Sequence, residues 1–130
     1  MTAPLLIEKT EETPTIVLDA ERGIFLFADT SWPEDAVLFY KPIYSWLEEY
    51  LQNPNDITLV DFQMNYFNTA SAKQIAKILI LFQHYSSKCN IRINWFYESD
   101  DKDMLRAGNR FSTLLNMKFE MIELPSQAIV

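Results

Sequence analysis

The stretch "DITLVDFQMNYFNTASAKQIAKILILFQ", residues 56–83, decides the fold. Residues 56–63 form an apolar run that predicts a buried strand, and from about residue 69 to residue 87 the apolar residues recur at helical spacing. A strand therefore leads through a short turn into a helix. Asn68 and Thr69 lie where that helix begins, and both residue types are favoured helix N-caps.

Strands and helices alternate outward from this unit. Residues 13–19 and 24–29 predict two strands joined by a turn at residues 20–23, and therefore a hairpin. After the helix at 69–87, residues 90–98 predict a strand and residues 99–116 predict a helix. A closing strand is predicted at residues 118–124.

A helix is also predicted between the hairpin and the strand at 56–63. In "SWPE", Ser31 and Glu34 have the spacing of a capping box, and Pro33 suits a first helical turn. The helix is expected to end near Gln52, before "NPND". Its apolar positions recur every three or four residues, at Val37, Tyr40, Ile43, Tyr44, Leu47 and Leu51.

The order β-β-α-β-α-β-α-β predicts a single α/β domain spanning residues 1–130. Strands that alternate with helices form parallel pairs through right-handed crossovers, and the hairpin makes the sheet mixed. We expect the helices to lie mainly on one face of that sheet. Residues 1–12 are polar and are expected to form a loosely held lead-in.

Composition narrows the functional classes. The chain has 130 residues and is 48% hydrophobic, which predicts a folded protein. Eleven Lys and Arg against 18 Asp and Glu give a net charge of −7, which argues against binding to nucleic acids or anionic membranes. Cys89 is the only cysteine, and the chain shows neither a signal peptide nor an apolar run of membrane-spanning length. We expect a soluble cytoplasmic protein.

Enzyme chemistry finds little support. The two glycines, Gly23 and Gly108, are too few for a dinucleotide or phosphate-binding loop. His84 and Cys89 lack the spacing of a zinc site. No cofactor is expected.

One acidic cluster leaves an alternative open. Asp100, Asp101 and Asp103 provide carboxylates for a divalent ion, as in a carboxylate-dependent metal enzyme. The same residues also suit the positive end of the dipole of the helix that follows, and we favour that interpretation.

Thr69 also has two interpretations. It can be a plain helix cap. A hydroxyl at a helix N-terminus is also a good phosphorylation site, because the free N–H groups and the helix dipole tolerate a phosphate.

The layout resembles the STAS domain of anti-sigma factor antagonists, in which a Ser or Thr that opens a helix after a strand is phosphorylated. It is more closely similar to the SiaC family of regulatory phosphoproteins, over nearly the whole chain. That resemblance is carried by "TPTIVLD" (13–19), "SWPEDAVLFYKPIYSWLEEYL" (31–51), "YFNTASAK" (66–73) and "WFYESDDKDMLRAGNRF" (95–111). Ala70 stands where a serine is common in the family.

The resemblance implies a partner-switching phosphoprotein without catalytic activity. A cognate kinase would phosphorylate Thr69, with Ser71 as second choice, and a PP2C-type phosphatase would remove the phosphate. The unphosphorylated form would bind and activate a diguanylate cyclase and raise cyclic di-GMP, favouring biofilm or aggregation. An antagonist that sequesters an anti-sigma kinase is the alternative of the same type. We expect the partner to contact Trp32, Tyr66, Phe67, Asn68, Thr69, Ser71 and Lys73.

Overall fold

The protein is described by a computed structural model over residues 2–125 and has six strands and three helices in that range. The elements follow one another as β1 (Leu5–Ile7), β2 (Thr15–Asp19), β3 (Ile24–Ser31), α1 (Ala36–Tyr50), β4 (Ile57–Phe67), α2 (Thr69–Tyr85), β5 (Asn90–Glu98), α3 (Lys102–Leu115) and β6 (Phe119–Leu124).

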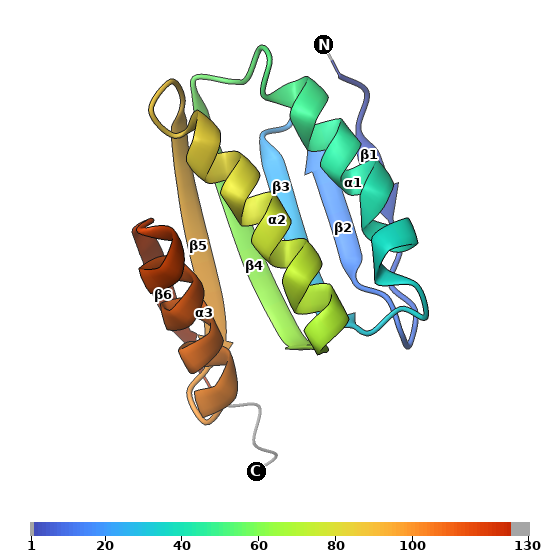
Figure 1. The fold of residues 1–130 in the computed structure, drawn as a ribbon, viewed down its shortest axis with the longest axis vertical. Coiled ribbons are helices and arrows are strands. Elements are labelled where there is room, and N and C mark those ends of the chain that lie inside the picture. Colours follow the sequence, from blue (N-terminus) through green and yellow to red (C-terminus); the bar gives the residue numbers. More distant parts are fainter. Residues whose placement is uncertain (1, 126–130) are drawn as a thin grey trace.

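All six strands form one sheet whose spatial order, β1-β2-β3-β4-β5-β6, is the order of the chain. The pairs β1–β2 and β2–β3 are antiparallel, whereas β3 to β6 are parallel. Each crossover moves one strand in the same direction, so right-handed connections bring every helix to the same side. Figure 1 shows α1, α2 and α3 on one face of the sheet. The predicted mixed α/β sheet with helices on one face is confirmed.

The core fills the space between this face and the helices. Trp95 of β5 is fully buried and stacks on Phe62 and Phe119, with ring centroids 5.3 Å and 5.9 Å apart. Trp46 is also buried, whereas 44% of Trp32 is exposed. Two of the three tryptophans therefore belong to the core.

The chain before β2 differs from the prediction. Within the expected loose lead-in, Leu5–Ile7 form β1, which pairs with β2. The carbonyl of Ala3 also accepts a hydrogen bond from Trp46 Nε1 at 2.6 Å. Three residues carry too weak an alternating pattern to predict a strand, but an edge strand of this length is stabilised by its neighbour.

The predicted capping box at the start of α1 is wrong. Ser31 lies in β3 with its side chain fully buried, so it cannot cap a helix. The amide of Trp32 donates to the carbonyl of Glu12 at 2.7 Å, and residues 32–34 precede the helix. Asp35 is the actual N-cap, and its Oδ1 accepts from the Leu38 amide at 3.0 Å.

Candidate functional site

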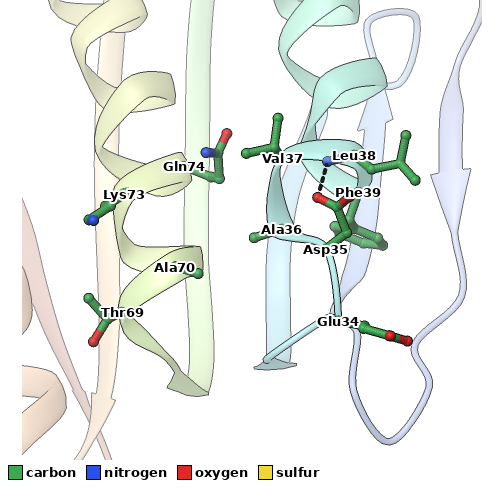
Figure 2. Close-up of a pocket in the computed structure, with 10 residues that line it drawn as sticks. All are labelled: Glu34, Asp35, Ala36, Val37, Leu38, Phe39, Thr69, Ala70, Lys73 and Gln74. Carbon is green, nitrogen blue, oxygen red and sulfur yellow. Dashed lines mark hydrogen bonds between the residues drawn. The ribbon is translucent and has the colours of Figure 1, made fainter.

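The candidate site lies at the carboxyl ends of β3 and β4, where the chain enters α1 and α2. The two strands end in register, with Ser31 opposite Phe67. Residues 32–35 then lead into α1, and Asn68 leads directly into α2. The first turns of the two helices therefore face each other across the end of the sheet (Figure 2).

Asn68, and not Thr69, caps α2. Its Oδ1 accepts from the Ser71 amide at 2.9 Å, and its carbonyl accepts from the Ala72 amide at 2.9 Å. Thr69 is thus the first helical residue. Its side chain is exposed and makes no hydrogen bond with residues 2–125. The hydroxyl of Thr69 is therefore not needed to start the helix.

Ser71 has the opposite environment. Its side chain is fully buried, and its Oγ lies 2.8 Å from Oγ of Ser31, which in turn lies 2.7 Å from the hydroxyl of Tyr40. Burial raises the pKa of the Tyr40 hydroxyl to about 12, although its hydrogen bonds partly oppose this rise. Of the two candidate phosphate acceptors, Thr69 is thus exposed and Ser71 is buried.

An open groove of about 950 Å³ separates the first turns of the two helices. Figure 2 shows Val37 reaching from α1 toward Gln74 of α2, whereas Thr69 and Lys73 point to the side of α2 away from α1. The groove is lined by Glu34, Asp35, Ala36, Val37, Leu38 and Phe39 on one side, and by Thr69, Ala70, Lys73 and Gln74 on the other.

The α1 wall carries two exposed aliphatic side chains. Val37 is 63% exposed and Leu38 is 67% exposed. Val37 belongs to the apolar series that the sequence predicted along α1, but its side chain is exposed at the groove. With the N-cap at Asp35, Val37 lies in a first turn that faces the groove. No local sequence signal marks this pair, because its place beside the groove depends on how α1 and α2 lie relative to each other.

The other predicted contact residues do not all lie at the surface. Tyr66 is 53% exposed, and Lys73 is exposed on the same side of α2 as Thr69 (Figure 2). Phe67 is only half-buried, but its ring packs against Trp95 and Phe111, each with a centroid distance of 6.2 Å. Its packing gives it a structural role in holding β4 against α3.

The acidic cluster before α3 starts a helix. Asp101 is the N-cap, and its Oδ1 accepts from the Met104 amide at 3.0 Å. Asp103 lies in the first turn and forms an exposed ion pair with Arg106 at 3.3 Å. Within residues 2–125, no group of three or more His, Cys, Asp or Glu side chains is arranged to hold a metal ion.

His84 and Cys89 lie apart from the candidate site. His84 is exposed near the end of α2, and its ring meets that of Tyr85 edge-on at 5.2 Å. Cys89 is a partly buried free thiol. Among the helices that the structure describes, none combines the length and apolar character needed to cross a membrane.

Known structures share this fold. The chain is similar to SiaC of Pseudomonas aeruginosa, with a TM-score of 0.80 and 22% identity over 95% of this chain and 98% of the other. It is also similar to a chain in the crystal structure of diguanylate cyclase SiaD in complex with its activator SiaC, from the same organism. There the TM-score is 0.83, with 22% identity over 94% of this chain and 99% of the other.

Sequence comparison agrees with this likeness. The chain is 24% identical over 108 residues to an uncharacterized protein of Pseudomonas aeruginosa strain UCBPP-PA14, covering 82% of this chain and 86% of that protein. The model of the SiaC family of regulatory phosphoproteins matches residues 7–124, which include every helix and the candidate site. With nearly the whole chain matched, the protein belongs to the SiaC family of regulatory phosphoproteins.

Proposed function

We propose that this protein is a non-enzymatic, cytoplasmic switch that is reversibly phosphorylated on Thr69. In the unphosphorylated form it binds and activates a diguanylate cyclase. A cognate kinase adds the phosphate and a PP2C-type phosphatase removes it. The observation that carries the proposal is the contrast at the start of α2: Thr69 is exposed and its side chain bonds to none of the described residues, whereas Ser71 is buried and hydrogen-bonded to Ser31. The SiaC structure bound to the cyclase SiaD supports the choice of partner.

The position of Thr69 suits a phosphate. As the first residue of α2, it lies at the positive end of the helix dipole. Phosphorylation adds about −1.5 to −2 charges, which a helix N-terminus accommodates. Because Asn68 supplies the cap, the modification does not remove a bond that holds the helix. The phosphate therefore changes the charge of the surface while the fold stays intact.

The proposed partner surface is the groove between α1 and α2 together with its rim. Val37 and Leu38 provide apolar area that is exposed in the free protein. Glu34 and Asp35 lie beside them, and Lys73 lies on the opposite wall. A dianion at Thr69 would be desolvated in this interface, where Lys73 offers one positive charge against about −1.5 to −2 and Glu34 and Asp35 add further negative charge, so binding becomes strongly unfavourable.

Phosphate mapping tests the choice of site. After co-expression with the cognate kinase, intact mass should show one major phosphate, and fragmentation should place it on Thr69. The variant Thr69→Ala should remain unmodified. A phosphate located mainly on Ser71, Thr13 or Thr15 would contradict the proposal.

Two substitutions at Thr69 separate charge from capping. Thr69→Ala removes the hydroxyl without adding charge, so it should bind the cyclase and escape the kinase. Thr69→Asp adds about one negative charge at the same place and should weaken binding by more than about a hundredfold, since each 1.4 kcal/mol is a tenfold change. Calorimetry gives both affinities, and circular dichroism controls for the fold. Equal affinities for the two variants would refute the charge mechanism.

The contact surface can be tested with a matched pair of aliphatic residues. Val37→Ser should weaken binding to the cyclase, because it removes exposed apolar area from the groove. Ile80→Ser is the control, since Ile80 is also exposed but lies about three turns farther along α2 than Thr69. A charge reversal, Lys73→Glu, should also weaken binding. Equal effects of the Val37 and Ile80 changes would exclude the groove as the docking surface.

A pull-down with the unphosphorylated protein as bait tests the identity of the partner. A diguanylate cyclase is the expected partner. If an anti-sigma kinase is recovered in its place, the proposed partner is wrong, and the proposed phosphorylation site is unaffected.

A further inference from the structure

Three buried hydroxyl groups link β3, α1 and α2 below the groove. Ser31 lies in the middle, with its Oγ 2.7 Å from the Tyr40 hydroxyl and 2.8 Å from Ser71 Oγ. All three side chains are buried almost completely. The carbonyl of Ser31 also accepts from the Asn68 amide at 3.1 Å. Ser31 therefore holds the start of α2 through its backbone and its side chain, and Tyr40 connects it to α1.

This arrangement restricts how the first turn of α2 can lie. A buried hydroxyl without a partner is unfavourable, so orientations that separate Ser71 from Ser31 are disfavoured. Successive helical residues are about 100° apart, so Thr69 and Ser71 project in nearly opposite directions. When Ser71 is held inward, Thr69 must face solvent.

We propose that Tyr40 is a positioning residue whose hydroxyl, through Ser31, fixes the first turn of α2. It thereby keeps Thr69 exposed to the kinase and Ser71 buried. The consequence for phosphorylation rests on the proposed function, but the positioning itself is a property of the fold. Because Tyr40 belongs to α1 and Ser71 to α2, the same link also sets how the two walls of the groove face each other.

The chain supplies a matched control at the other end of α1. Tyr50 is also buried, and its hydroxyl lies 2.7 Å from Oγ1 of the buried Thr58 in β4. It additionally accepts from the Asn55 amide at 3.0 Å. Tyr50→Phe therefore loses at least as many hydrogen bonds as Tyr40→Phe, but none of them involves α2.

Amide hydrogen exchange on the full chain tests the positioning. In Tyr40→Phe the amides of Ser71 and Ala72 should exchange about fivefold faster than in Tyr50→Phe, which is the change expected from losing one hydrogen bond of about 1 kcal/mol. Ser31→Ala should accelerate exchange of the same amides, and it is the alternative variant if Tyr40→Phe folds poorly. Equal exchange of these two amides in the Tyr40 and Tyr50 variants would overturn the proposal.

Phosphate mapping on the same variants tests the consequence. The ratio of phosphate on Ser71 to phosphate on Thr69 should rise in Tyr40→Phe and stay at the parent value in Tyr50→Phe. An unchanged ratio in a phosphorylated Tyr40→Phe protein would overturn the role in site selection. If the parent protein accepts no phosphate at all, the proposed function fails, and the exchange experiment still decides the positioning.

Discussion

Raising the pH above 10 should destabilise the fold through one buried tyrosine. Tyr40 is almost completely buried, and burial raises the pKa of its hydroxyl to about 12, against an ordinary value of 10.0. The folded state therefore holds the phenolic proton more tightly than the unfolded state does. The stability that this difference contributes is fully present below pH 10 and is lost as the pH rises from 10 to 12.

The expected loss follows from the size of the shift. A difference of about two pKa units corresponds to a maximum of about 3 kcal/mol, with about half of it lost by pH 11. Tyr40→Phe removes the titrating group and, at neutral pH, one buried hydrogen bond of about 1 kcal/mol. The variant should therefore be less stable than the parent at pH 8, and the two free energies of unfolding should cross near pH 11.

Urea unfolding at a series of pH values from 8 to 12 measures this directly. The contributions of all groups that the parent and the variant share cancel in the difference between their free energies of unfolding. A constant difference between the parent and Tyr40→Phe across this range would refute the assignment of the alkaline loss to Tyr40.

Two further predictions concern stability. Gly108→Ala should lower the free energy of unfolding by about 1–3 kcal/mol, because its Cβ would lie 2.5 Å from Cδ1 of the buried Trp95. This cost should exceed the gain from the better helix propensity of Ala. An unchanged free energy in urea unfolding would contradict the prediction and show that α3 moves away without cost. Asn68→Ala should cost about 1 kcal/mol, whereas Thr69→Ala should change stability by less than about 0.5 kcal/mol, since Asn68 alone caps α2. The reverse order in thermal or urea unfolding would return the capping role to Thr69.

The sequence predicted the layout well where periodic patterns are long. The strand at 90–98 has the predicted bounds, and the starts of α2 and β4 lie within one residue of the prediction. Local sequence signals gave wrong predictions where tertiary contacts determine the bounds of an element. "SWPE" has the chemistry of a helix start, but β3 continues through Ser31 because this residue pairs with β4 and its hydroxyl meets Tyr40 and Ser71. Residues distant in the sequence supply these partners, so no local pattern reveals them.

The candidate site was predicted only in part. The turn at residues 66–73 was found from its strand–helix context, and the family resemblance singled out Thr69. The sequence left open whether Asn68 or Thr69 caps α2, since both are suitable caps; the hydrogen bond from Ser71 to Asn68 decides it. The exposed pair Val37 and Leu38 was missed, because their place beside the groove depends on how α1 and α2 lie relative to each other.

The central claim is that phosphate on Thr69 controls binding to the cyclase. The most direct test is a calorimetric titration of the diguanylate cyclase with two forms of the unaltered chain, one unphosphorylated and one phosphorylated only on Thr69. The account predicts that the unphosphorylated form binds and that the phosphorylated form binds more than about a hundredfold more weakly, with the same circular dichroism spectrum. Equal dissociation constants for the two forms would contradict it.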